Sequence, residues 1–126
     1  GVRPEAGPID ASYSTNFTDA DLLCRALLDL GADPVRRADG TIACRIEGTR
    51  LIFAQEPEHP FTVAIQGAAD VEQAYRYLSD IDEDYKRAVQ TSVYERVKTE
   101  AADRDMVITG EEVLPDRSIM LTLRLN

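Results

Sequence analysis

The chain has 126 residues, 44% of them hydrophobic, and a formal net charge of −9 from 14 basic and 23 acidic residues. This length fits one domain with a hydrophobic core. The acidic balance argues against nucleic acids and anionic membranes as partners, because both are bound by clustered Lys and Arg. No apolar run approaches the roughly 18 residues of a membrane span, and no signal-peptide pattern opens the chain. We therefore expect a cytoplasmic protein.

The N-terminal part predicts a tail, a short strand and a helix. Residues 1–10 are rich in Gly, Pro and Ala, which indicates a flexible tail before a single domain over 11–126. A strand is expected within 12–17. The acidic residue Asp19 suits the start of a helix, and Gly31 suits the position after its end. Between them, apolar residues recur at helical spacing: Leu23, Ala26, Leu27 and Leu30.

A β-rich section follows the first helix. Asp39-Gly40 and Glu47-Gly48 are turn signals between segments of alternating polarity. The segment 51–54 is apolar on both faces, which is typical of a central strand. The expected strands are 34–37, 42–46, 51–54 and 61–65.

A long helical pattern begins after Asp70, which suits an N-cap with Gln73 three residues later. Its first apolar face includes Tyr75 and its second begins at Tyr85, so we expect both rings in the core and Tyr77 and Tyr94 at the surface. One helix of about 33 residues would be roughly 50 Å long, too long for one domain. We therefore expect a break or bend between Ser79 and Asp84.

The chain ends in a predicted β-hairpin. A strand over 106–114, bulged at Gly110, leads through a turn at 115–117 to a strand that alternates cleanly. We expect four apolar residues of the last strand to face the helices: Ile119, Leu121, Leu123 and Leu125. The fold class is thus α+β, with an antiparallel sheet, helices packed on one face and a C-terminal β-hairpin.

No motif in the sequence indicates catalysis, a metal or a cofactor. Cys24 and Cys44 match no metal spacing and lie beside apolar neighbours, which favours buried thiols, although a disulfide stays open. His59, the single histidine, lies in an expected surface loop and favours an exposed side chain over a general base. We therefore expect no catalytic residue, no bound metal and no cofactor.

Six residues are candidates for binding a protein partner. Four form the densest acidic cluster, which can cap a helix, hold a cation, or dock to a basic partner. The other two lie on the outer helix surface, where an exposed Tyr beside a Lys can anchor an interface, although the pattern favours a partly buried spacer residue. The six are Asp80, Asp82, Glu83, Asp84, Tyr94 and Lys98.

Two segments together resemble a family of small plastid and cyanobacterial proteins, hypothetical chloroplast frame thirty-five and its bacterial relatives. The first segment contains Ser12-Tyr13, Asp21-Leu22-Leu23, Ala26-Leu27 and Asp29-Leu30-Gly31. The second contains Tyr94-Glu95-Arg96-Val97-Lys98, the stretch 106–113, Ser118-Ile119 and Leu121 to Leu123. The chain departs from the family pattern at Arg104 and Asp105, where a Gly is expected. The family has no established activity, and the resemblance implies an accessory protein that works beside AAA-type ATPases.

We therefore expect a non-enzymatic adaptor that binds another protein. One alternative is a small enzyme or small-molecule binder with a pocket between sheet and helices. Another is a homodimer that forms through an exposed sheet edge or face. The adaptor is favoured because the sequence lacks a catalytic set, has an acidic surface and carries the resemblance.

Overall fold

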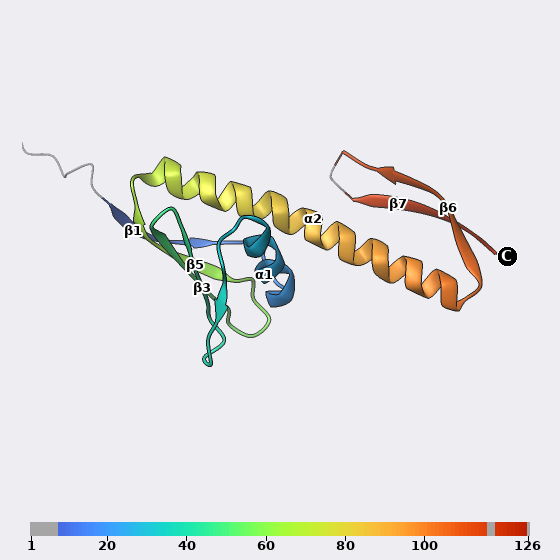
Figure 1. The fold of residues 1–126 in the computed structure, drawn as a ribbon, viewed down its shortest axis with the longest axis horizontal. Helices are drawn as coiled ribbons and strands as arrows, with labels where there is room; N and C mark the ends of the chain where they lie inside the picture. The colour runs from blue at the N-terminus through green and yellow to red at the C-terminus, as the bar shows by residue number, and fades with distance from the viewer. Residues whose placement is uncertain (1–7, 116–117, 126) are drawn as a thin grey trace, which may run out of the picture. The chain divides into compact units, whose positions relative to one another are not determined.

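The computed structural model describes residues 8–115 and 118–125 (Figure 1). It contains the strands β1 (Ile9–Ser14), β2 (Val35–Arg36), β3 (Ile42–Ile46), β4 (Thr49–Ala54), β5 (Thr62–Ala68), β6 (Met106–Val113) and β7 (Ile119–Leu125). Its helices are α1 (Ala20–Asp29) and α2 (Val71–Asp103). The predicted α+β class is confirmed, because every strand pair is antiparallel and the last two strands form a hairpin.

The chain divides into two compact units, with the boundary between Tyr85 and Lys86 inside α2. The first, called the sheet unit below, contains β1 to β5, α1 and the first half of α2. The second, called the hairpin unit, contains the rest of α2 and the hairpin of β6 and β7. All of the net charge lies in the sheet unit, which has seven basic and 16 acidic residues, whereas the hairpin unit has seven of each.

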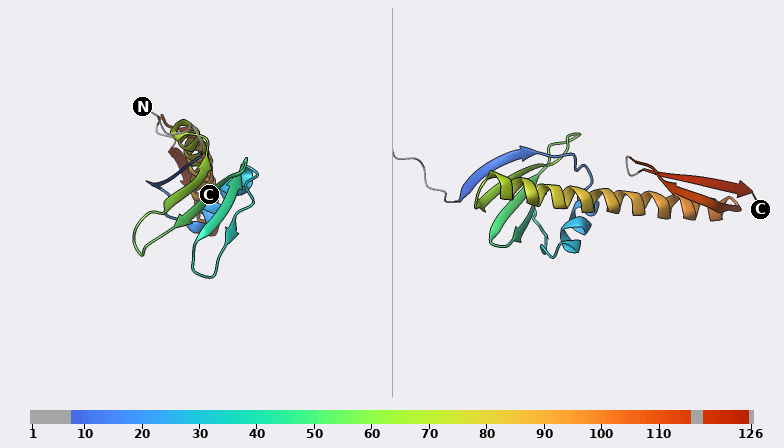
Figure 2. Two further views of the ribbon diagram at one scale, coloured as in Figure 1. Left: turned by 90° about the vertical axis from the view of Figure 1, so that its left-hand side faces the viewer. Right: turned by 90° about the horizontal axis from the view of Figure 1, so that it is seen from above.

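The sheet unit is built on a five-stranded sheet in the order β1-β5-β4-β3-β2 (Figure 2). β4 is central, as its apolar composition predicts. One face of the sheet is buried, and its side chains include Ile42, Phe53 and Val63, which lie opposite one another across three strands. The ring of Phe17 contacts that of Phe53 in β4, with centroids 6.3 Å apart, and that of Tyr85 in α2, with centroids 4.8 Å apart. α2 therefore covers this inner face.

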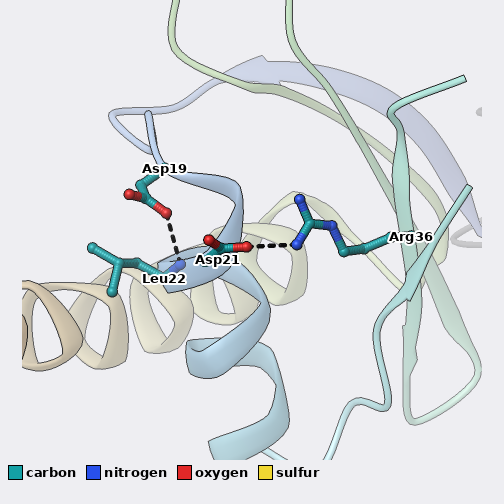
Figure 3. A network of polar contacts seen from close by, with 4 residues as sticks. All are labelled: Asp19, Asp21, Leu22 and Arg36. Carbon is teal, nitrogen blue, oxygen red and sulfur yellow. Dashed lines mark hydrogen bonds and ion pairs between the residues drawn. The ribbon is translucent and has the colours of Figure 1, made fainter.

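α1 covers the same inner face and has the ends that the sequence predicts. Asp19 is its N-cap, and its carboxylate accepts a hydrogen bond from the Leu22 amide at 3.0 Å (Figure 3). Asp21, in the first turn, forms an ion pair of 2.6 Å with Arg36 of β2. The apolar side of α1 is buried at Leu23, Ala26 and Leu27.

β1 begins earlier than the sequence pattern indicates. It starts at Ile9, so the last two residues of the stretch expected to be a tail pair with β5 instead. The remaining residues of that stretch, 1–7, lie outside the described residues. The register shifts at Ile9 because Gly67, with φ of +84°, adds one residue to β5 at this point.

The expected break in the long helix is wrong, because residues 71–103 form one continuous α-helix. No Gly or Pro interrupts them, so each amide keeps its acceptor one turn earlier. The expectation assumed that the whole helix packs within one domain, whereas its two halves belong to different units. The N-terminal cap is confirmed: Asp70 accepts from the Gln73 amide at 2.8 Å, and the Gln73 side chain accepts from Ala69 at 2.7 Å.

The expected positions of two tyrosines on α2 are also wrong. Tyr75 is 56% exposed, with its ring 5.3 Å from that of Tyr13, whereas Tyr77 is only 6% exposed. The buried positions of this half are three or four residues apart up to Asp84, and Tyr85 follows directly: Ala74, Tyr77, Ile81, Asp84 and Tyr85. The buried face thus lies farther round the helix than the stripe of aliphatic residues indicated. Tyr85 is buried, as expected.

The hairpin contains the predicted bulge. Ile108 pairs with Leu123 and Gly110 with Thr122, so Thr109 is the extra residue. The bulge changes the face of the residues that follow it and brings Val113 onto the side of Ile108. The expected turn falls partly at 116–117, which lie outside the described residues.

Candidate functional site

The acidic cluster at the middle of α2 is not one surface. Asp80 and Glu83 are exposed, Asp82 is half-buried, and Asp84 is 8% exposed. Successive helix residues differ by about 100°, so Asp82 lies about 200° round the helix from Asp80. Asp82, Glu83 and Asp84 also interact with other groups of the chain. A partner can therefore reach Asp80 and Glu83 together, but not Asp84 without a rearrangement.

Tyr94 and Lys98 lie in the hairpin unit and line an open groove of about 530 Å³ between α2 and β6. Tyr94 is half-buried and Lys98 is exposed. A hydrogen bond with the Glu111 carboxylate raises the pKa of the Tyr94 hydroxyl, because the carboxylate stabilises the protonated phenol. Tyr94 and Lys98 therefore lie next to the hairpin.

The hairpin unit also has one side that is rich in apolar residues. It includes the four residues of the last strand that were expected to face the helices. Cross-strand register places seven apolar side chains on one side of the hairpin: Met106, Ile108, Val113, Ile119, Leu121, Leu123 and Leu125. None of the seven is buried, and Leu125 and Val113 are 71% and 67% exposed. The expectation that the apolar side of the last strand faces the helices agrees with this register, because Met106 and Ile108 on the same side line the groove with Tyr94 of α2. The side chains there are only partly buried. Alternation identifies the apolar face of a strand but does not say what covers it.

Two grooves of the sheet unit are open to solvent. One of about 420 Å³ is lined by His59, Glu56 and Thr15, and another of about 400 Å³ by Tyr75 and Asp82. His59 is exposed, as expected for a loop histidine. These grooves expose polar side chains of several kinds.

Both cysteines are free thiols. Cys44 is buried, and this burial raises the pKa of its thiol to about 11. Cys24 is half-buried, and desolvation raises its pKa as well. Since the thiolate is the reactive form, neither group is activated for nucleophilic attack near neutral pH.

The described part of the chain shows neither a metal-binding cluster nor a membrane-spanning helix. Among residues 8–115 and 118–125, His, Cys, Asp and Glu side chains do not gather in threes in a way that could hold a metal ion. None of the helices in those ranges combines the length and the apolar character needed to cross a membrane.

Comparison with known proteins adds no relationship. The chain matches no family model, no curated protein and no solved structure. The geometry of the described residues is therefore the basis for any statement of function, and the apolar hairpin face is its most distinctive element.

Proposed function

We propose that this chain is a non-enzymatic adaptor that binds another protein through the apolar hairpin face. The supporting observation is the incomplete burial of that face: of its seven apolar side chains three are exposed and four are half-buried, with Glu111 beside Leu121 on the same side. The apolar side chains of the hairpin are only partly covered within the described residues, so they gain from further burial. Covering a Val or Leu side chain fully contributes about 1.5–3 kcal/mol.

The local structure supports a binding role for this face. The bulge at Gly110 places Val113, rather than Glu112, beside Ile119 on the apolar side. Tyr94 and Lys98 border the adjacent groove and supply an aromatic ring and a cation at its rim. In this proposal they assist the hairpin, whereas Asp80 and Glu83 remain a separate acidic surface for a basic segment of the partner.

The resemblance described above suggests the kind of partner. Proteins of that family are thought of as companions of AAA-type ATPases, so a subunit of such an ATPase is the first partner to test. The adaptor would then link the ATPase to a second protein and would itself perform no chemistry.

Site-specific photo-crosslinking in cells of the source organism tests this proposal. A photoreactive residue in place of Val113 should crosslink to one protein of defined mass, which is then purified and shown to bind in a stable complex. The same residue at Leu28, an exposed position of α1, should give no such product. Absence of a crosslink from the hairpin, or equal crosslinking from both positions, would reject the adaptor.

A homodimer is the second candidate, and the charge distribution favours it at this surface. The hairpin unit has seven basic and seven acidic residues, so two copies can meet there without the repulsion expected between sheet units of charge −9. Sedimentation equilibrium decides this candidate. A species of twice 14.0 kDa that reverts to monomer with Leu125→Asp supports it, and a monomer at all concentrations rejects it.

A further inference from the structure

The sheet unit contains a groove of opposite charge to the rest of the molecule. The groove has a volume of about 590 Å³ and lies beside β2, β3 and β4. Three of the seven arginines of the sheet unit line it, together with a single carboxylate, that of Asp33. The three are Arg37, Arg45 and Arg50. This local excess of positive charge stands in a unit whose net charge is −9.

Two of these arginines are held side by side by the backbone. The turn Glu47-Gly48, in which both residues have positive φ, fixes the register of β3 and β4. Arg45 and Arg50 are consequently direct cross-strand partners on the outer face of the sheet. Like charges at such positions, with Cβ atoms about 5 Å apart, destabilise a sheet. An anion between them removes this cost.

The structure gives Arg45 and Arg50 no carboxylate of their own. Among the described residues, none forms an ion pair within 4 Å of Arg37, Arg45 or Arg50, whereas Arg36 on the inner side pairs with Asp21. Asp33 lines the same groove without such contact, whereas the Asp39 carboxylate accepts hydrogen bonds from Thr41 and is also attracted to Arg37. The guanidinium groups of Arg45 and Arg50 are therefore available to an incoming anion.

The part of the groove that lies between the arginines is lined by small apolar side chains. Val35 and Ala43 are cross-strand partners on the outer face, and both line it with Ala32. Val35 is 61% exposed. A ligand that suits this surface carries carboxylates for the guanidinium groups and an aliphatic group for the small side chains between them.

We propose that this groove binds a short acidic segment of a partner protein that carries both Glu or Asp and an aliphatic residue. Nucleic acid fits less well, because it presents many phosphates to a chain with 23 acidic residues and only three arginines at this place. This inference rests on the proposed function, because it takes the ligand to be part of a partner protein. The groove belongs to the sheet unit and binds independently of the hairpin face.

Fluorescence anisotropy with the full chain tests the groove. The probe is a short fluorescein-labelled peptide of Glu and Leu, and the control peptide has Gln in place of each Glu. We expect saturable binding of the Glu peptide that weakens with added NaCl, and about tenfold weaker binding to Arg45→Gln and to Arg50→Gln, each of which removes charge-assisted hydrogen bonds. Arg25→Gln, which alters an exposed arginine of α1, should bind as the unchanged protein does.

Several results overturn the proposal. These are equal binding of the Gln peptide, equal loss with Arg25→Gln, tighter binding of a single-stranded oligonucleotide, or full displacement of the peptide by inorganic phosphate at equal concentration. Melting curves show that the variants fold, and Arg37→Gln, outside the strands, gives a second test if Arg45→Gln does not. Leu125→Asp, which damages only the hairpin face, should leave peptide binding unchanged, so a failure of the adaptor and a failure of this groove are distinguished.

Discussion

The hydroxyl of Tyr77 donates a hydrogen bond of 2.9 Å to Oε2 of Glu47 and so connects α2 with the turn between β3 and β4. The two residues are 30 positions apart in the sequence. Tyr77 is buried, so its hydroxyl needs this partner. The contact fixes the first half of α2 over the turn that also determines the pairing of Arg45 with Arg50.

Tyr77→Phe removes the donor of this hydrogen bond and keeps the ring. We expect the free energy of unfolding to fall by about 1 kcal/mol, the usual net contribution of one hydrogen bond. Urea denaturation followed by circular dichroism measures it. Tyr75→Phe is the matched control, because the Tyr75 side chain is more than half exposed, and it should change stability little. An equal loss in both variants would contradict the role given to the Glu47 contact.

The stability of the sheet unit should fall in alkaline solution because of Cys44. Burial raises the pKa of this thiol from 9.0 to about 11, so between these values the folded chain keeps a proton that the unfolded chain loses. The contribution is complete below pH 9.0 and is lost as the pH rises to about 11. Urea denaturation at several pH values should show a smaller alkaline slope for Cys44→Ala. An unchanged slope would show that the thiol titrates alike in both states.

Gly67→Ala should destabilise the protein through the backbone. Gly67 has φ of +84° at the β5 bulge, a conformation that costs an L-residue about 1 kcal/mol or more. Gly110→Ala is the control at the other bulge, where a new Cβ would lie 3.8 Å from Thr122, an ordinary contact. Thermal melting should show a lower Tm for the first variant and a small change for the second. Similar losses for both would argue against the conformational explanation.

Leu125→Asp and Leu28→Asp separate binding from folding. Both leucines are exposed, at 71% and 59%, so neither substitution should change the free energy of unfolding by more than about 0.5 kcal/mol. The first places a charge on the apolar hairpin face and should abolish the complex with the crosslinked partner, as measured by calorimetric titration. The second lies on α1 and should leave the complex intact. Retained binding by Leu125→Asp would move the interface elsewhere.

Much of the fold could be predicted because local patterns determine it. The turns Asp39-Gly40 and Glu47-Gly48, the alternation of β3 and the cap at Asp70 each act within a few residues. The register of Arg45 and Arg50 was also accessible, since a two-residue turn after Ile46 dictates it.

The errors concern contacts that the local pattern does not specify. The spacing of apolar residues in α2 does not show which side of the helix packs on the sheet. In the structure Tyr77 is buried and Tyr75 is exposed. The continuity of α2 was missed because the sequence pattern does not show that the helix belongs to two units. The apolar side of the hairpin was identified correctly, whereas its exposure depends on neighbours that a strand pattern does not reveal. Asp84 was placed at a surface for the same reason.

The continuity of α2 has a consequence for its order in solution. Its first half is anchored by four buried side chains before Tyr85, whereas the hairpin unit buries only Ala88 and Ala101 among its described hydrophobic residues. Helices without packing are marginal at this length, so fraying that starts near Asp103 meets little resistance until it nears the sheet unit. If the hairpin face binds the proposed partner, ordering of the second half of α2 and binding of that partner form one coupled equilibrium. The affinity measured at the hairpin face would include the free energy of completing the helix.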